Sequence, residues 1–210
     1  MSRFRFRILE LRDSTPQEWL RVWDGRYQEH DEKEYRDLIG KHESLSAEDF
    51  VRIGKWKDGA KTPRLWKPNV AHVAYPIWME AVQKLPKCPE ESDVEAFLNY
   101  WSGRMYTDKF EKGGRVVEKP FGVPRATTLL HFISGGHFPM IDSRVRRAIA
   151  RLRNDQAPKN TVRWYLDSFR PLFSELAALC KTEGDPRTLD RALFSYGSKA
   201  LSSEKFSFSN

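Results

Sequence analysis

The chain has 210 residues, of which 40% are hydrophobic and 13% aromatic, which is enough apolar material for the core of one domain. It carries 36 Lys and Arg against 29 Asp and Glu, a formal net charge of +7, which favours a polyanionic partner, nucleic acid before an anionic membrane surface. It contains no apolar run typical of a membrane helix, no Cys/His cluster with metal-ligand spacing, and only 2 cysteines, which excludes a four-cysteine iron–sulfur cluster. We therefore expect no metal or other cofactor, no secretory signal and a cytoplasmic location.

The N-terminal half predicts an arm followed by helices. Residues 1–12 alternate basic and apolar side chains, which indicates a short strand or an extended arm. Thr15 opens "TPQEWLRVW" and Ser46 opens "SAEDFVRIG", and both have the pattern of a capped helix. Residues 55–69 are rich in Lys, Gly and Pro and contain two tryptophans, so they are interpreted as a basic loop. Residues 70–85 are apolar at helical spacing.

The middle of the chain predicts three helices around a loop. A helix is expected to begin near Glu90 and to end at Gly103. Residues 106–120 are polar and contain Gly113–Gly114, so they are interpreted as a loop. Two helices are expected after it, over residues 124–134 and 143–153.

The C-terminal third predicts two or three more helices and a loose tail. One helix is opened by Asp185 and ends at Gly197, and residues 201–210 are expected to be loose. The resulting prediction is an all-α fold of about eight to ten short helices. We expect residues 13–200 to form a single domain, either one compact unit or two lobes, and the protein to be a monomer.

Residues 143–153 combine an apolar stripe with arginines. Val145, Ala148, Ile149 and Leu152 lie at i, i+3, i+4 and i+7, so one face of the helix is expected to be buried. The arginines on the other faces, which are expected to point outward, are Arg144, Arg146, Arg147, Arg151 and Arg153.

Asp142 immediately precedes this basic helix and has two interpretations. Aspartate is a favoured N-cap, which contributes about 1 kcal/mol, so Asp142 can be a purely structural residue. The preceding "FPMI" is apolar, however, and a carboxylate beside it can be partly desolvated while the helix dipole keeps it ionised. Such a group suits the stabilisation of a cationic transition state near phosphates.

The stretch "PFGVPRATTLLHF" followed by "FPMIDSRVRRAI" resembles the helix-hairpin-helix DNA glycosylase superfamily over about 30 residues. The hairpin of that family typically reads Leu-Pro-Gly-Val-Gly, and Gly122 and Val123 match its core. The segment "IDSRVRR" matches the family's aspartate segment, so the resemblance puts Asp142 in the catalytic place, with hairpin and catalytic segment within residues 118–153. Pro124 replaces the second family glycine and removes one N–H donor.

The resemblance implies a DNA glycosylase without an iron–sulfur cluster that flips a base and hydrolyses its N-glycosidic bond. Family members that also cut the backbone have a lysine early in the helix after the hairpin, where this chain has Ala126. Alanine forms no Schiff base, so a monofunctional enzyme that leaves an abasic site is expected. Lys109, Lys112 and Lys119 are the lysines nearby in sequence that remain as alternatives.

Further residues are assigned to DNA and base binding. The residues expected to contact double-stranded DNA are Gly122, Val123, Arg125, Arg144, Arg146, Arg147 and Arg151. The candidates for the base pocket are Trp66, Trp101, Tyr106, His137 and Phe138, each of which is also a candidate for the core. His137 is in addition a candidate acid, whereas His131 is expected to be a helix residue with a satisfied hydrogen bond.

Two other functions remain open at this point. One is a non-catalytic helix-hairpin-helix DNA-binding module in which Asp142 is only a cap. The other is a basic all-α interaction protein whose motif is accidental. Within the glycosylase hypothesis, both repair of a damaged base and attack on a modified base in phage DNA are compatible with the sequence, and the base itself does not follow from it.

Overall fold

The protein is described here from a computed structural model, which covers residues 15–27, 32–41, 44–58, 79–80, 82–103, 105–112, 115–153 and 156–198. For residues 105–112 and 115–120 it is the backbone that is described. The predictions for residues 1–12 and 201–210, for most of the loop 55–69 and for most of 70–85 lie outside this part of the chain.

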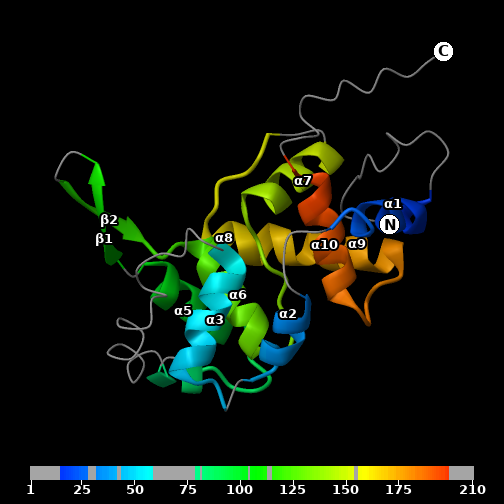
Figure 1. Cartoon of the computed structure of the whole chain (residues 1–210). Helices are drawn as coiled ribbons and strands as arrows, with labels where there is room; N and C mark the ends of the chain where they lie inside the picture. Colours follow the sequence, from blue (N-terminus) through cyan, green and yellow to red (C-terminus); the bar gives the residue numbers. More distant parts are fainter. Residues whose placement is uncertain are drawn as a thin grey trace.

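The fold is helical, as predicted, with one small sheet added (Figure 1). The helices of the first half are α1 (Pro16–Asp24), α2 (Glu32–Leu38), α3 (Ala47–Asp58) and α5 (Glu91–Ser102). The second half contains α6 (Val123–Ile133), α7 (Ser143–Arg153), α8 (Val162–Trp164), the π-helix η4 (Tyr165–Phe169), α9 (Arg170–Cys180) and α10 (Pro186–Tyr196). None of the helices in the described ranges has the length and apolarity that a membrane span requires.

The helix starts follow the capping signals of the sequence. Thr15 Oγ1 accepts a hydrogen bond from the amide of Glu18 at 3.2 Å. At the start of α3 the amide of Asp49 donates to Ser46 Oγ at 3.0 Å, and Asp49 Oδ2 accepts from the amide of Ser46 at 3.1 Å. These bonds satisfy amides that have no partner within the helix, and the predictions that Thr15 and Ser46 open helices are confirmed.

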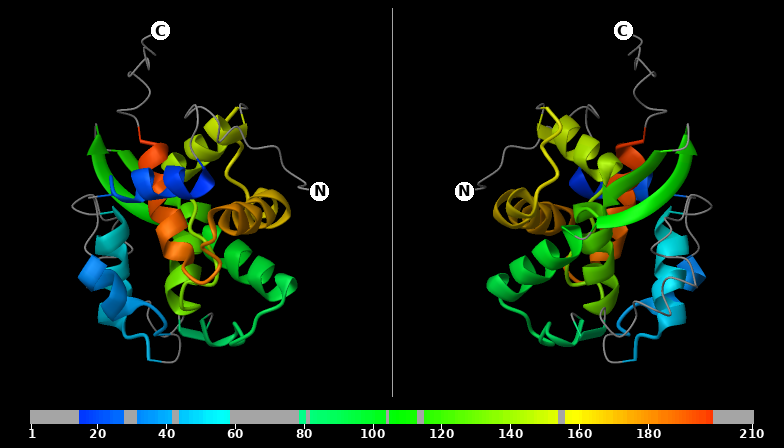
Figure 2. Two further views of the ribbon diagram at one scale, coloured as in Figure 1. Left: turned by 90° about the vertical axis from the view of Figure 1, so that its right-hand side faces the viewer. Right: turned by 90° about the vertical axis from the view of Figure 1, so that its left-hand side faces the viewer.

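The interpretation of residues 106–120 as a loop is wrong, because they form an antiparallel hairpin of β1 (Met105–Lys112) and β2 (Arg115–Pro120). Lys112 pairs with Arg115, so only Gly113–Gly114 separates the strands, a pair that suits a two-residue hairpin connection. The hairpin stands away from the helices in Figure 1, and the right-hand view of Figure 2 shows it from that side, in front of them. Its sequence nevertheless has the polar composition of a loop.

The hairpin is inserted between α5 and α6, whose ends are joined by a hydrogen bond. The amide of Gly122 donates to the carbonyl of Ser102 at 3.1 Å, so the end of α5 and the start of α6 lie together. Gly122 has φ 80° and ψ 157°, a conformation that is almost restricted to glycine. This turn therefore requires glycine for folding, whatever else it does.

One continuous cluster of buried side chains extends from Trp19 in α1 to Leu193 in α10. Within it α10 packs on both α1 and α7. The end of α10 approaches α7 so closely that a Cβ added to Gly197 would lie 1.8 Å from the carbonyl oxygen of Arg144. The predicted arrangement in two lobes stays a prediction.

The close approach of α10 to α7 can be tested with Gly197→Ala. The added methyl group has to push the two helices apart, and we expect a loss of about 3 kcal/mol in the free energy of unfolding, as for other overpacked interiors. Gly184→Ala is the matched control, because nothing lies within 4 Å of a Cβ there. Chemical denaturation of both variants measures the difference, and equal stabilities would contradict the described packing.

Candidate functional site

Residues 138–141, which precede α7, form a buried segment outside any helix or strand, and the segment is held by hydrogen bonds from three directions. Its first carbonyl bonds to His131 Nδ1 at 2.7 Å, and the next carbonyl accepts from the Tyr165 hydroxyl at 2.9 Å. The amide of Ile141 donates to Thr127 Oγ1 at 3.2 Å. Side chains from α6 and η4 thus fix the path of the chain into α7.

His131 is a buried, neutral structural residue, as expected. Its Nε2 lies 2.8 Å from the Tyr35 hydroxyl, so both ring nitrogens have partners when Nδ1–H donates to the Phe138 carbonyl and Tyr35 donates to Nε2. Burial lowers the pKa of His131 to about 3, against the effect of the Phe138 carbonyl, and the charges of Arg187 and Lys57 lower it further.

Asp142 follows this segment and caps α7. Its Oδ1 accepts from the amides of Arg144 at 2.8 Å and Val145 at 2.9 Å, which confirms the predicted N-cap. Its Oδ2 lies 3.4 Å from Nζ of Lys57, a residue 85 positions earlier in the chain. Burial raises the pKa of Asp142, but the charge of Lys57 and the two amides outweigh it, so the pKa lies below its usual value and the group is ionised at neutral pH.

Asp142 lies at a small recess between α3, α7 and α10. Its other lining residues are Tyr27, Trp56, Lys57, Met140, Val145, Arg187, Asp190 and Phe194. The recess measures about 10 Å³, room for about one water molecule. It combines charged side chains with three aromatic rings, and two of these rings, Tyr27 and Trp56, lie against the guanidinium group of Arg187.

Most of this lining was missed by the sequence analysis. Trp56 and Lys57 were placed in the basic loop, but α3 continues to Asp58, so both are helical and fixed in position. Arg187 and Asp190 belong to α10, far from Asp142 in sequence, and no spacing rule connects the two segments. The only local signal was that "KWKD" has a tryptophan beside lysines.

Arg187 is a buried cation whose two terminal nitrogens bond to neighbours, while its buried Nε has no hydrogen-bond partner among the described residues. It donates to Asp190 Oδ2 at 2.5 Å, to the Tyr27 hydroxyl at 2.8 Å and to Glu32 Oε1 at 2.7 Å. Burial raises the pKa of Asp190, against the charges of Arg187 and Lys57, and the charge of Asp142 raises it further. The environments of the two carboxyl groups of the recess therefore shift their pKa values in opposite directions.

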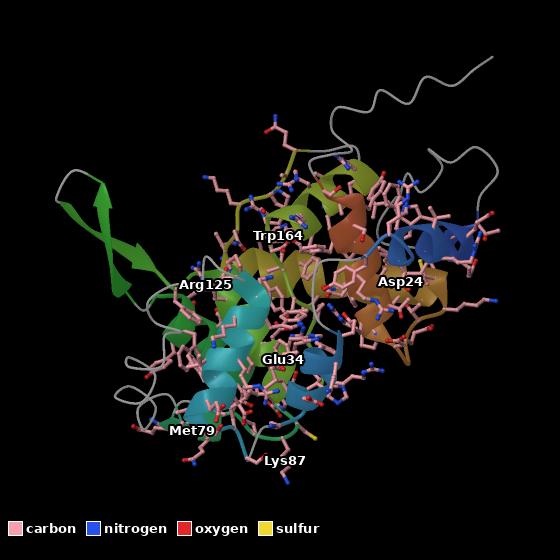
Figure 3. The ribbon with its side chains drawn as sticks, viewed as in Figure 1. Asp24, Glu34, Met79, Lys87, Arg125 and Trp164 are labelled. Carbon is pink, nitrogen blue, oxygen red and sulfur yellow. The ribbon has the colours of Figure 1, made fainter. Side chains whose placement is uncertain are left out.

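The start of α6, with Gly122 and Val123, lies at the same end of α3 as Asp142. Arg125 Nε donates to Asp58 Oδ2 at 2.9 Å, while the preceding residue, Lys57, contacts Asp142. Figure 3 labels Arg125 beside α3. The amide of Gly122 donates to the carbonyl of Ser102, so it is not available to a phosphate in this structure, and the Val123 side chain is buried.

Four of the five arginines of α7 are half-buried and bonded within the chain, whereas the sequence predicted that all five point outward, and Arg153 is exposed as predicted. Their partners are the Phe194 ring for Arg144 at 4.3 Å, the Pro158 carbonyl for Arg146 at 2.7 Å, the Gly197 carbonyl for Arg147 at 2.8 Å and the Tyr196 carbonyl for Arg151. Arg147 and Arg151 thus donate hydrogen bonds to carbonyls at the C-terminal end of α10, where a cation stabilises a helix. Contact with DNA phosphates stays a prediction for all of them.

The proposed base-pocket residues are not brought together. Trp101 is fully buried in the core, so its assignment to a pocket is wrong. Phe138 is buried as well and does not line the recess. His137 lines a separate groove of about 450 Å³ at the other end of α6, Tyr106 belongs to β1, and Trp66 lies outside the described residues.

Comparison with family models, curated proteins and solved structures finds no match to this chain. Within the described ranges, no group of His, Cys, Asp and Glu side chains is arranged to hold a metal ion. The function is therefore argued from the residues and geometry of the recess.

The neutral state of His131 has a measurable consequence. Because the pKa of His131 is about 3 in the folded protein, against 6.5 for a histidine in the unfolded chain, the unfolded chain binds a proton between these pH values that the folded chain does not. The contribution of His131 to stability is therefore complete above pH 6.5 and decreases as the pH falls toward 3. In NMR titrations of the folded protein, we expect the His131 ring signals to stay constant from pH 8 to about pH 5. A midpoint near 6.5 would contradict the buried hydrogen-bonded geometry.

Proposed function

We propose that the protein is a monofunctional DNA glycosylase, which flips a damaged or modified base out of duplex DNA, hydrolyses its N-glycosidic bond and leaves an abasic site. The observation that carries the proposal is the last turn of α3, where Lys57 contacts Asp142 and Asp58 contacts Arg125. Lys57 and Asp58, which are consecutive, thus link the aspartate segment to the start of α6. These are the two segments that resemble the glycosylase superfamily. The role is base repair or defence against phage DNA with modified bases, in the cytoplasm and as a monomer.

The chemistry proposed for Asp142 follows from its two oxygens. Oδ1 is held by two amides, so the carboxylate cannot turn, and Oδ2 is directed toward Lys57 at the recess. As a glycosidic bond breaks, the sugar acquires oxocarbenium character, and an ionised carboxylate fixed beside it stabilises that charge without reorganising. The lowered pKa of Asp142 supports this role, because a protonated carboxyl group would not provide the charge.

Binding of the base requires the recess to open. A volume of about 10 Å³ does not hold a nucleobase, so the half-buried side chains of Tyr27 and Phe194 have to move when a nucleotide enters. The net charge of +7 provides attraction to DNA, and Arg125 with the arginines of α7 is proposed for phosphate contacts. Lids and side-chain gates of this kind are common where a reactive sugar has to be shielded from water.

The small recess favours a second candidate, a DNA-binding module without catalysis. In that case Asp142 is an N-cap neutralised by Lys57, and the aromatic rings at the recess are core. The two candidates differ in one property, whether a free base is released from DNA in an Asp142-dependent manner.

Asp142→Asn tests the glycosylase proposal, and the matched control is Asp185→Asn. Asp185 caps α10 by accepting from the amide of Thr188 at 3.3 Å, but it is exposed and does not line the recess. Both variants keep an oxygen that can cap a helix. We expect Asp142→Asn to fold and bind DNA but to release bases about 10²–10³-fold more slowly, whereas Asp185→Asn keeps the parental rate.

The measurement is the mass-spectrometric detection of bases released from genomic DNAs that carry different base modifications, which also identifies the substrate. If Asp142→Asn released bases at the parental rate, Asp142 would be an N-cap of α7 and not a catalytic residue. Salt-dependent DNA binding without release of any base would support the second candidate.

The proposed enzyme leaves the DNA backbone intact. Ala126 is fully buried in α6 and carries no amine, and the amine nitrogen of Lys57 lies 3.4 Å from the Asp142 carboxylate in an ion pair. We expect the product strand to break only after hot alkali, and borohydride added during the reaction to trap no protein–DNA adduct. An adduct detected by electrophoresis and mapped to Lys57, Lys109, Lys112 or Lys119 would contradict the monofunctional mechanism.

A further inference from the structure

Lys57 is an almost completely buried lysine on the last turn of α3. Its side chain is 11% exposed and that of Asp142 is 17% exposed. Lysine is rarely buried to this extent unless it is paired, because the desolvation of an ammonium ion is costly. Within the described part of the chain, Asp142 is the one hydrogen-bond partner of Nζ, which has three protons to donate.

The contact between Lys57 and Asp142 is loose. Its 3.4 Å exceeds the 2.7–2.9 Å of a well-formed charge-assisted hydrogen bond, whereas the amides bond the other oxygen of Asp142 at 2.8 and 2.9 Å. With respect to the residues that the structure describes, the ammonium group therefore has protons left for another acceptor in the recess. An acceptor that enters next to Asp142 also enters next to Lys57.

The other polar groups of the recess are less suited to give up a proton. Arg187 does not deprotonate in proteins and is bonded to Asp190, Tyr27 and Glu32. Burial raises the pKa of the Tyr27 hydroxyl well above its usual value, against the charge of Arg187. Burial raises the pKa of the Asp190 carboxyl, but its Oδ2 accepts a hydrogen bond from Arg187, so it is held as the acceptor of that pair. Lys57 remains as the proton donor of this lining.

We propose that Lys57 is the general acid of base release, an inference that rests on the proposed glycosylase function. The bond between C1′ and the base nitrogen breaks, its electron pair stays on that nitrogen, and a proton from Lys57 Nζ neutralises the departing base. Water then attacks C1′ and gives its proton to Asp142. Transfer of that proton from Oδ2 to the Lys57 amine restores both residues, so one water is consumed and the base leaves with one proton.

Replacement of Lys57 followed by rescue with small ammonium ions tests this role. We expect Lys57→Ala to release base about 10²-fold or more slowly, and Lys57→Arg to lose a similar factor because guanidinium keeps the charge but is a poor acid. Lys55→Ala is the matched control on the same helix, since Lys55 is exposed. The DNA is the one from which the parent protein releases a base, and thermal unfolding confirms that each variant is folded.

The decisive measurement is rescue of Lys57→Ala by ethylammonium and by 2-fluoroethylammonium, ions of similar size and different acidity. Transfer of a proton predicts rescue rates that change with the acidity of the ion, and no rescue by ethylguanidinium. Equal rescue by all three cations, or a parental rate of Lys57→Arg, would show that Lys57 provides charge only and would overturn the proposal. A borohydride adduct lost in Lys57→Ala would overturn it in favour of a nucleophile.

Failure of this inference is distinguishable from failure of the proposed function. If the parent protein releases no base from any modified DNA, both fail. If the parent releases a base and Asp142→Asn does not, while Lys57→Arg is fully active, only the role of Lys57 fails.

Discussion

Residues 138–141 pass through the interior without the hydrogen bonds of a helix or sheet, and the rest of the site depends on the side-chain hydrogen bonds that replace them. A buried backbone group without a partner costs about 1–3 kcal/mol, so each of the three bonds from His131, Tyr165 and Thr127 has a clear physical purpose. Together they determine where α7 begins. Asp142 lies at that point, so its carboxylate is directed into the recess by the same bonds that stabilise the segment.

The charges of the recess balance locally. Asp142 lies against Lys57 and Asp190 against Arg187, so each carboxyl group of the recess has a basic side chain beside it. Arg187 also connects α10 to Glu32 of α2, and Arg191 connects it to Asp24 of α1, which Figure 3 labels. Because α10 contacts α7 closely at Gly197, these ion pairs and the capped start of α7 position one another. Most of the site is thus built on helices, which hold charged groups more accurately than loops, while Tyr27, Met140 and Asp142 come from the segments between them.

The parts of this structure that depend on neighbours in sequence were predictable. Caps at Thr15 and Ser46, the buried stripe of α7 and the N-cap role of Asp142 are all local patterns. The contact of Asp142 with Lys57 spans 85 positions, and such pairing depends on tertiary packing that a single sequence does not encode in any local pattern.

Composition alone was a poor guide to structure in three parts of the chain. The strands of the hairpin β1–β2 pair with each other, although their sequence is polar and lacks the apolar alternation that predicts a half-buried strand. Trp101 was a pocket candidate because aromatic residues serve both cores and base stacking, and only burial decides between them. In the same way, the arginines of α7 have the composition of a DNA-binding face, although Arg147 and Arg151 bond to carbonyls at the end of α10.

The central claim is that the Asp142 carboxylate faces a sugar that becomes positively charged, and a stable cation in place of that sugar tests it without knowledge of the base. The measurement is the Kd of the protein for two DNA duplexes, one with a cationic pyrrolidine and one with a neutral tetrahydrofuran at the abasic position. We predict that the parent protein binds the pyrrolidine duplex at least ~10²-fold more tightly, as expected for a transition-state analogue, and that Asp142→Asn largely loses this preference. Equal binding of the two duplexes by the parent, or an undiminished preference in Asp142→Asn, would contradict the account.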